Sequence, residues 1–249
     1  MPSTRGQSNP YDGIAKYYNL LFEDWDQVVE SEGQRLEGIL GLKGVRSVID
    51  VTCGTGLQCI GLALRGFEVT GCDNSPAMLR EARRNARRAG VRVEFVEADL
   101  LAMPESLSGR FDAAISCGNS LSHLPTLTEL KHAFSAMHSL LRSSGYCVVD
   151  SWDYEGMMRD RPAGIYNRVV EVAGKRIIMY DTRSYRGDVV ATQFNLLRET
   201  GRGWKSAQFA MDLRMWRKEE LREALKVAGF GEAVASVAGE CLEWVCRKL

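Results

Sequence analysis

The chain has 249 residues, of which 45% are hydrophobic, and its 32 Lys and Arg residues balance its 32 Asp and Glu residues. This length suits one large α/β domain with an insertion. A net charge of zero lacks the broad positive field that non-specific nucleic-acid binding needs, so no nucleic-acid partner is expected. No run of ~18 apolar residues occurs, so no membrane partner is expected, and residues 1–9 lack the apolar core of a signal peptide.

Residues 1–42 are predicted to form an N-terminal helical cap rich in aromatic side chains. The rings of Tyr17 and Trp25 could attract a cationic ligand, or they could simply pack on the core. Arg35 could hold a carboxylate with its planar guanidinium, or it could be a surface charge of the helix predicted over Val28–Leu42.

The segment from Val45 to Asp73 is the pattern that organises the chain. Val48, Ile49 and Val51 suit a buried strand, and a glycine-rich turn with Gly54 and Gly56 follows. A helical segment and a second strand, Phe67–Cys72, then lead to an acid. Strand, turn, helix, strand and acid predict a βαβ nucleotide-binding unit in which Asp73 accepts hydrogen bonds from ribose hydroxyls.

The turn itself discriminates between ligands. Position 59 is Cys, so the Gly-x-Gly-x-x-Gly dinucleotide pattern is incomplete, and the Gly-Lys-Ser/Thr of a phosphate-binding loop is absent. The run Asp50-Val-Thr-Cys-Gly-Thr-Gly56 resembles motif I of the class I S-adenosylmethionine (SAM) methyltransferases. The alternative is a plain strand-to-helix turn in a flavodoxin-like domain.

Further polar groups follow the next strands. Asn74-Ser75-Pro76 begins a helix, with Ser75 as its N-cap, and Met78 could pack on an adenine ring. The third strand, Val91–Val96, leads to Asp99 and Leu100. The Asp99 carboxylate could accept from an adenine amino group or could only cap a turn.

The fourth strand, Phe111–Cys117, runs into the loop Gly118–Pro125, where polar groups converge on Asn119, Ser120 and His123. In open α/β sheets, ligands bind outside the carboxyl ends of the strands, at the point where strand order reverses. A hydrolase triad is disfavoured because no Gly-x-Ser-x-Gly elbow is present.

The second half of the chain changes pattern. The fifth strand is predicted over Tyr146–Asp150, and four β-like runs follow over 165–172, 175–181, 189–198 and 207–213, with glycines between them. We therefore expect a doubly wound, Rossmann-like α/β sheet of seven strands with an antiparallel β insertion after the fifth. The expected regions are the cap (1–42), a SAM-binding core (43–160), a β lid (161–214) and a C-terminal helix with two strands that complete the sheet (215–249).

Neither metal binding nor disulfides are expected. The seven cysteines include no Cys-x-x-Cys pair, and buried thiols in a reducing cytoplasm explain them best. His132 and His138 lie six residues apart on a predicted helix and so occupy different faces.

Three segments together resemble the glycine N-methyltransferase and glycine/sarcosine N-methyltransferase group: Asp50–Gly56, Gly66–Asp73 and Gly118–Pro125. The segment Tyr17–Trp25 is also similar. This resemblance implies a cofactor site formed by Tyr17, Trp25, Arg35, Thr52, Asp73, Asp99, Leu100, Cys117, Ser120 and His123. Gly54, Gly56, Asn74 and Met78 are expected to complete that site. The resemblance also implies that Asn119 faces an amine substrate.

One departure from that group concerns the substrate. The group has an Arg after the fifth strand that holds the carboxylate of glycine, whereas this chain has Trp152. A Tyr of the group that serves the same carboxylate falls near Phe194. Arg168 or Arg183 from the insertion would have to replace the missing cation, so the resemblance does not imply glycine as the substrate.

The sequence thus predicts a cytoplasmic SAM-dependent methyltransferase that acts on a small molecule, most naturally at an amine nitrogen, and releases S-adenosylhomocysteine. Tyr154 and Tyr166 are candidates for shaping the catalytic pocket beside Asn119. A natural-product O-methyltransferase and a SAM-binding regulator without turnover are the alternatives. Assembly into a homo-oligomer is compatible with the sequence.

Overall fold

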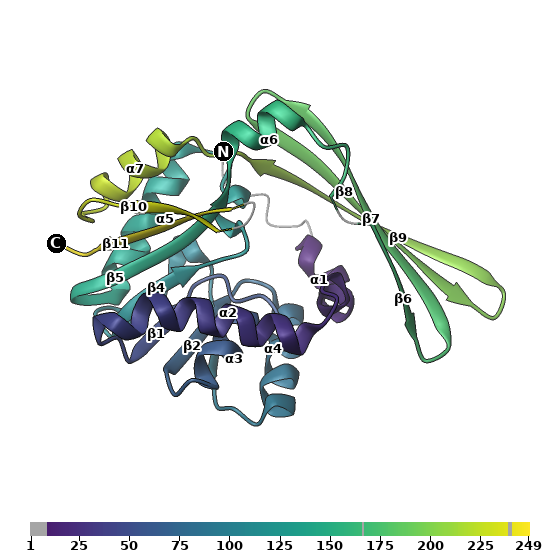
Figure 1. Cartoon of the computed structure of the whole chain (residues 1–249), viewed down its shortest axis with the longest axis horizontal. Helices are drawn as coiled ribbons and strands as arrows, with labels where there is room; N and C mark the ends of the chain where they lie inside the picture. Colours follow the sequence, from purple (N-terminus) through teal and green to yellow (C-terminus); the bar gives the residue numbers. More distant parts are fainter. Residues whose placement is uncertain (1–8, 166, 239–240) are drawn as a thin grey trace.

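A seven-stranded sheet forms the centre of the computed structural model, which describes residues 9–165, 167–238 and 241–249 (Figure 1). The strand order is β10-β11-β5-β4-β1-β2-β3. Neighbouring strands from β5 to β3 are parallel, whereas β11 is antiparallel to β5 and to β10. The bounds are β1 (Ser47–Asp50), β2 (Glu68–Asp73), β3 (Glu94–Glu97), β4 (Phe111–Ser116), β5 (Leu141–Trp152), β10 (Val234–Ala238) and β11 (Cys241–Arg247). The predicted doubly wound sheet is confirmed.

Alternation along the strands supplies two hydrophobic cores, because successive side chains point to opposite faces of a sheet. On β1, Val48 packs with α2 (Trp25–Leu40), α3 (Leu57–Ala63) and α4 (Pro76–Ala89). Its neighbour Ile49 packs on the opposite face with α5 (Leu127–Leu140) and α7 (Lys218–Val227). Both residues are fully buried, as expected for a strand that is covered on both faces.

Two glycines bring α2 directly against α3. A Cβ atom added at Gly33 would lie 2.5 Å from the carbonyl oxygen of Gly61, and one added at Gly61 would lie 2.6 Å from that of Val29. Both distances are too short for any side chain, so only glycine permits this crossing. The crossing holds the middle of α2 beside α3, the helix that follows the glycine-rich turn.

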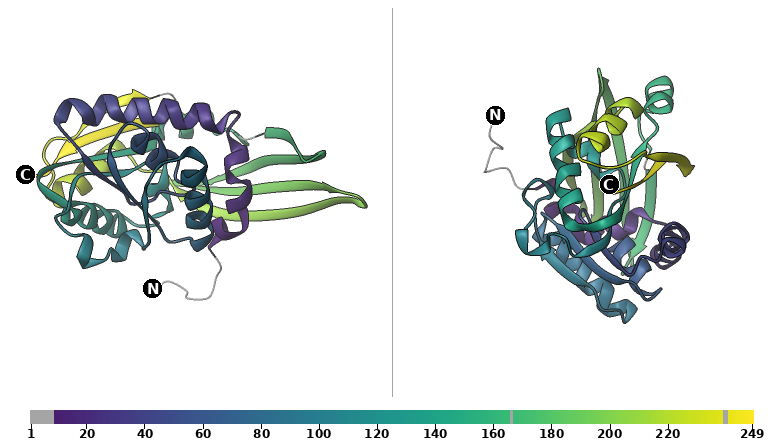
Figure 2. Two further views of the ribbon diagram at one scale, coloured as in Figure 1. Left: turned by 90° about the horizontal axis from the view of Figure 1, so that it is seen from below. Right: turned by 90° about the vertical axis from the view of Figure 1, so that its left-hand side faces the viewer.

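The insertion forms a separate four-stranded antiparallel sheet in the order β6-β7-β8-β9, which projects away from the body (Figure 2). Its strands are β6 (Asn167–Val172), β7 (Lys175–Arg186), β8 (Val189–Thr200) and β9 (Gly203–Arg214). Helix α1 (Pro10–Tyr18) packs on this sheet through an apolar cluster that includes Ile14 and Phe194. The predicted antiparallel insertion is confirmed.

Several element boundaries differ from the predictions. Strand β5 begins at Leu141, and residues 142–145 form an irregularity within it, because Leu141 pairs with Phe111 and Tyr146 pairs with Ala113. Helix α5 begins at Leu127, since Thr126 and Glu129 form a capping box. Strand β3 begins only at Glu94, and α7 ends at Val227.

A short helix, α6 (Tyr154–Asp160), was not predicted and connects β5 to the insertion. The part of the chain that the structure describes also contains five 3-10 turns: η1 (Asn19–Leu21), η2 (Gly41–Lys43), η3 (Leu100–Ala102), η4 (Glu105–Leu107) and η5 (Ser120–His123). Six of the seven cysteines are buried, as the sequence predicts. Within the described ranges, no helix has the length and apolar character needed to cross a bilayer.

Candidate active site

A cavity of about 900 Å³ opens at the carboxyl ends of the central parallel strands. Its walls come from the carboxyl-terminal acids of β2 and β5 and from the loops that follow β1, β2, β3 and β4, with α1 and α2 contributing from the N-terminal cap. Strands β4 and β1 are neighbours in the sheet but not in the chain, so the cavity lies where the strand order reverses. This is the position predicted from the loop after the fourth strand.

The glycine-rich turn and Asp73 form one wall. Gly54 has a positive φ of 52°, and its N–H donates to Oδ2 of Asp73 at 2.8 Å. The N–H of Ser75 donates to Oδ1 of the same carboxylate at 2.8 Å. Burial raises the pKa of Asp73, although these hydrogen bonds to the charged form oppose that shift. Two backbone donors therefore fix an acidic acceptor at the cavity wall, where ribose hydroxyls could bind.

The next part of the wall is apolar. Met78 is 1% exposed, Leu100 is 9% exposed, and both line the cavity together with Asn74. Asp99 also lines it, and its Oδ1 accepts the N–H of Leu101 at 2.8 Å as the cap of η3. Asp99 therefore has the turn-capping role that the sequence left open, and it also faces the cavity.

The loop after β4 is held by Asp150, the last acid of β5. Its two carboxylate oxygens accept the N–H groups of Gly118 and Asn119 at 2.8 and 2.6 Å. Ser120 donates to the carbonyl of Cys117 at 2.8 Å, and both residues line the cavity. Asp150 was not predicted as a site residue, although, like Asp50 and Asp73, it lies in the carboxyl-terminal part of a parallel strand.

Asn119 lies beside the cavity but is not among its lining residues. It is 5% exposed and has a left-handed φ of 58°. Its Oδ1 accepts the hydroxyl of Ser122 at 2.8 Å and the N–H of Trp152 at 3.0 Å. Because this oxygen already accepts two hydrogen bonds, Asn119 shapes the loop more than it serves as an acceptor for an amine.

A tyrosine and a histidine meet at the mouth of the cavity. The hydroxyl of Tyr11, from α1, lies 2.7 Å from Nε2 of His123, and both residues line the cavity. His123 is open to the cavity, and desolvation in this recess lowers its pKa to about 4. The imidazole is therefore neutral at pH 7 and can either donate to or accept from the phenol.

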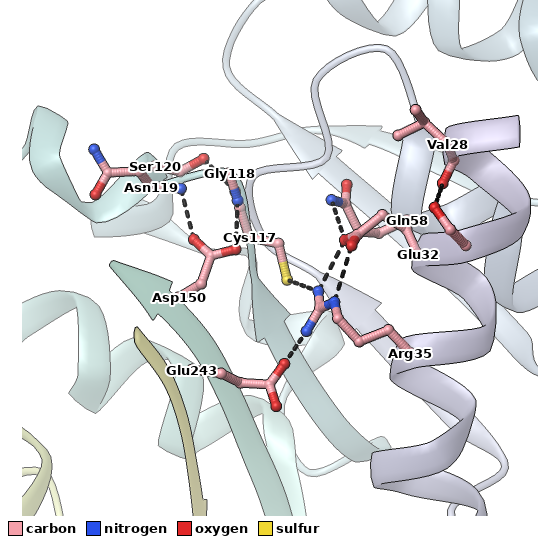
Figure 3. Close-up of polar contacts among 11 residues, drawn as sticks. Val28, Glu32, Arg35, Gln58, Cys117, Gly118, Asn119, Ser120, Asp150 and Glu243 are labelled. Atoms are coloured by element: carbon pink, nitrogen blue, oxygen red, sulfur yellow. Dashed lines mark hydrogen bonds and ion pairs between the residues drawn. The ribbon is translucent and has the colours of Figure 1, made fainter. Parts of the chain in front are cut away.

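Arg35 lies behind the cavity wall in a cluster of polar side chains (Figure 3). Its Nε and one terminal nitrogen donate to the two oxygens of Glu32 at 2.9 and 2.8 Å. It also pairs with Glu243 of β11 and contacts Sγ of Cys117 at 3.8 Å. Glu32, Gln58 and Cys117 line the cavity, whereas Arg35 does not.

Several predicted site residues lie outside the cavity lining. Tyr17 packs in the apolar cluster under the insertion, and Trp25 packs with Val29 and Ile60. The residues of the cap that do line the cavity are Tyr11, Tyr18 and Phe22. The sequence predicts an aromatic cap, and the packing of α1 and α2 decides which of its rings line the cavity.

Gly56 is a packing position rather than a cavity wall, because an added Cβ would lie 3.3 Å from Ala82 and Phe95. Phe194 is 4% exposed within the cluster that joins α1 to the insertion. Tyr154 donates to Asp188 at 2.6 Å and accepts from Arg217 at 2.6 Å, away from the cavity lining. Tyr166 lies outside the described residues, and Thr52 lines the cavity as predicted.

Comparison with known proteins agrees with this architecture. Residues 48–145 match the family model described as a methyltransferase domain.

Relatives of this domain include a glycine/sarcosine N-methyltransferase of Parasynechococcus marenigrum (strain WH8102), 35% identical over 135 residues. That match covers 54% of this chain and 48% of the relative. The chain thus spans about half the length of the curated relatives it matches.

Solved structures show that the methyltransferase fold extends through the whole chain. The sugar N-methyltransferase KedS8 from Streptoalloteichus sp ATCC 53650 has a TM-score of 0.80 and 24% identity, over 100% of this chain and 97% of that one. SAM-bound CalS10, an amino pentose methyltransferase from Micromonospora echinaspora, has a TM-score of 0.74 and 22% identity, over 98% of each chain. The cofactor of this class of domain is SAM, as the sequence motif predicts.

The lining and volume of the cavity fit that cofactor. Its volume of about 900 Å³ is near the upper end of the usual range for ligand pockets, so a small second molecule could share it. Asp73 offers an acidic acceptor beside the apolar walls of Met78 and Leu100. Among the described residues, the buried hydroxyl of Thr55 has no protein partner, and Thr55 lines the same cavity.

Proposed function

We propose that the chain is a SAM-dependent methyltransferase that methylates an amine nitrogen of a small molecule other than glycine. The observation that carries the proposal is the cavity in which Asp73, held by the N–H groups of Gly54 and Ser75, stands beside the loop that contains His123. One cavity therefore contains both a hydrogen-bond acceptor for the ribose of SAM and polar groups that could hold a second molecule.

SAM supplies a methyl group that is already activated by the positive charge on sulfur. The protein then has to align the acceptor and exclude water, and such positioning can contribute ~7–11 kcal/mol to lowering the barrier. The acceptor amine must bind in its neutral form, since an ammonium group has no lone pair. The neutral His123 ring and the Tyr11 hydroxyl are polar groups at the cavity mouth that can hold this amine.

The surroundings of Trp152 favour an acceptor that is not a small amino acid. A carboxylate needs a cation, because a buried carboxylate without a partner carries a large desolvation cost. The guanidinium of Arg183 lies over the Trp152 ring at 4.5 Å, but its Nε already donates to Asp181 at 2.6 Å. Arg168, the other candidate cation, donates to the carbonyl of Glu23 at 3.3 Å and does not line the cavity.

Amino sugars are an acceptor class worth testing. The structures described as a sugar N-methyltransferase and an amino pentose methyltransferase cover nearly the whole chain, including its insertion. An amino sugar has an amine nitrogen and hydroxyl groups but no carboxylate, which matches the neutral polar groups of Tyr11 and His123 in the cavity lining. Trp152 itself does not line the cavity. We also propose that residues 161–214 act as the acceptor-side lid of a SAM-binding core formed by residues 43–160.

The test is release of S-adenosylhomocysteine with a panel of acceptors: glycine, sarcosine, amino sugars, aromatic amines and hydroxylated analogues without nitrogen. Turnover with amino sugars or larger amines supports the proposal. Turnover only with the hydroxylated analogues would instead assign a natural-product O-methyltransferase. Tight SAM binding with no turnover on any acceptor would favour a regulatory SAM-binding protein.

A further inference from the structure

The cavity has two chemically different ends. Asp73 and Asp99 follow β2 and β3, whereas Cys117 follows β4 on the other side of β1. Asp73 and the apolar walls around it suit the nucleoside of the cofactor. The amino-acid end of the cofactor must then lie toward Cys117, where Glu32 and Gln58 also line the cavity.

The guanidinium of Arg35 is almost fully occupied at this end. Of its five N–H groups, four already have partners: two donate to Glu32, one to Glu243 and one to Cys117. A guanidinium grips a carboxylate through two adjacent N–H groups. In Arg35 one such pair is taken by Glu32 and the other is divided between Glu243 and Cys117 (Figure 3).

Glu32, in contrast, keeps acceptor capacity. Its carboxylate accepts three hydrogen bonds, two from Arg35 and one from Gln58 at 3.2 Å, and a carboxylate has about four acceptor positions. Burial opposes its ionisation, but the hydrogen bonds and positive charge of Arg35 outweigh burial and lower the pKa of Glu32. Glu32 is therefore an oriented carboxylate in the cavity wall at neutral pH.

The net charge of the cluster around Arg35 also favours binding of an ammonium group. One guanidinium faces two carboxylates, Glu32 and Glu243, so this cluster carries an excess negative charge. Such a cluster attracts an ammonium group and repels a carboxylate. The close crossing at Gly33 and Gly61 holds α2, and with it Glu32, beside α3.

We propose, on the basis of SAM use as proposed above, that Glu32 binds the α-ammonium group of the cofactor and that Arg35 is a positioning residue for Glu32. This differs from the role that the family resemblance implies for Arg35, which is direct binding of the cofactor carboxylate. The two roles predict opposite sensitivities to removal of the amine and removal of the carboxylate.

The experiment is calorimetric titration with four ligands: S-adenosylhomocysteine, its analogue without the carboxylate, its analogue without the amine, and 5′-methylthioadenosine, which lacks the whole amino-acid end. For the wild type, loss of the amine should weaken binding more than loss of the carboxylate. Glu32→Gln should weaken S-adenosylhomocysteine binding by about tenfold or more, since a hydrogen bond to a charged group contributes ~1.5–3 kcal/mol. Binding of 5′-methylthioadenosine should change less than about twofold.

Arg35→Gln separates the two roles. If Arg35 only orients Glu32, this variant weakens binding of the amine-bearing ligands and leaves the amine-free analogue unaffected. Weaker binding of the amine-free analogue by Arg35→Gln would overturn the proposal, because it would show that Arg35 contacts the carboxylate of the ligand directly. Unchanged S-adenosylhomocysteine binding by Glu32→Gln would overturn it as well.

Glu30→Gln is the matched control. Glu30 lies on the same helix and pairs with Arg65, and its side chain is 67% exposed and outside the cavity lining. The Glu30→Gln variant should bind all four ligands as the wild type does. Failure of the wild type to bind either SAM or 5′-methylthioadenosine would be a distinct result, since it would refute the proposed function and not only the role of Glu32.

Discussion

The guanidinium of Arg183 lies 4.5 Å from the centre of the Trp152 ring, and its Nε donates to Asp181 at 2.6 Å. The side chains of Arg183 and Asp181 are 1% and 0% exposed, so this ion pair is buried. A cation that the sequence offered as a partner for an acceptor carboxylate is thus already paired, and it covers the aromatic ring that replaces the arginine of the glycine-methylating group.

From this arrangement we expect glycine and sarcosine to be poor acceptors relative to larger amines. Trp152→Arg should raise the ratio of glycine turnover to larger-amine turnover, because it adds a cation beside the cavity. The measurement is methyl transfer to the same panel by wild type and variant. Efficient methylation of glycine by the wild type would contradict this expectation. It would mean that a cation other than Arg168 or Arg183 binds the carboxylate of glycine.

The Arg183–Asp181 pair should also be important for stability. Removing one partner of a buried pair leaves an uncompensated charge and costs about 3–5 kcal/mol. Arg183→Met should therefore lower the free energy of unfolding by about that amount, measured by urea denaturation. Arg159→Met is the matched control, since the Arg159–Asp160 pair is largely exposed and its loss should change stability little. Equal effects of the two substitutions would argue against a structural role for the buried pair.

Asp73→Ala should weaken SAM binding by at least about tenfold, because the ribose hydroxyls would lose a charged acceptor and each such bond contributes ~1.5–3 kcal/mol. Asp73→Asn keeps one acceptor oxygen and should have a smaller effect. Glu68→Gln, an exposed position on the same strand, is the control. Calorimetric titration measures all three, and wild-type affinity in Asp73→Ala would refute the assignment of this end of the cavity to the nucleoside.

Asp50 should make stability depend on pH. Burial raises its pKa to about 7 in the folded protein, whereas an aspartate in an unfolded chain titrates near 3.9. Between about pH 4 and 7 the folded state therefore holds a proton that the unfolded state has lost. The free energy of unfolding contributed by this group falls as pH rises through that window, by at most about 1.4 kcal/mol per pH unit.

Asp50→Asn removes that titration, so its stability relative to the wild type should be higher at pH 8 than at pH 5. Urea denaturation of both proteins at the two pH values measures the change. Asp26→Asn is a control whose side chain is 83% exposed. A constant difference between Asp50→Asn and the wild type at the two pH values would show that Asp50 has a similar pKa in the folded and unfolded states.

The core of the fold could be predicted from local signals. Buried strands such as β1 have apolar residues on both faces, here Val48 and Ile49, and glycines at 54 and 56 occupy positions with positive φ. Asp73 follows its strand at the spacing of a nucleotide site, and the structure places it on the cavity wall. These features depend on interactions between near neighbours in the chain, which the order of residues contains directly.

Element ends were predicted less well. The irregularity at residues 142–145 depends on pairing between β4 and β5, which are separated by a whole helix. The start of α5 could have been predicted, because Thr126 and Glu129 have the spacing of a capping box. The short helix α6 has an N-cap, Asp153, but few residues to produce a helical period.

By itself, the sequence determined the sheet, its glycine-rich turn and the acids that end its strands, since each follows from local spacing and side-chain period. Only the tertiary structure decided which aromatic residues of the cap face the cavity and what Arg35 and Arg183 contact. Glu243 pairs with Arg35 although the two residues are 208 positions apart in the chain. The packing of β11 near α2, and not the local sequence, determines such a partner. A charged side chain takes its role from the charges that folding brings to it, and here folding paired both arginines with carboxylates of the protein itself.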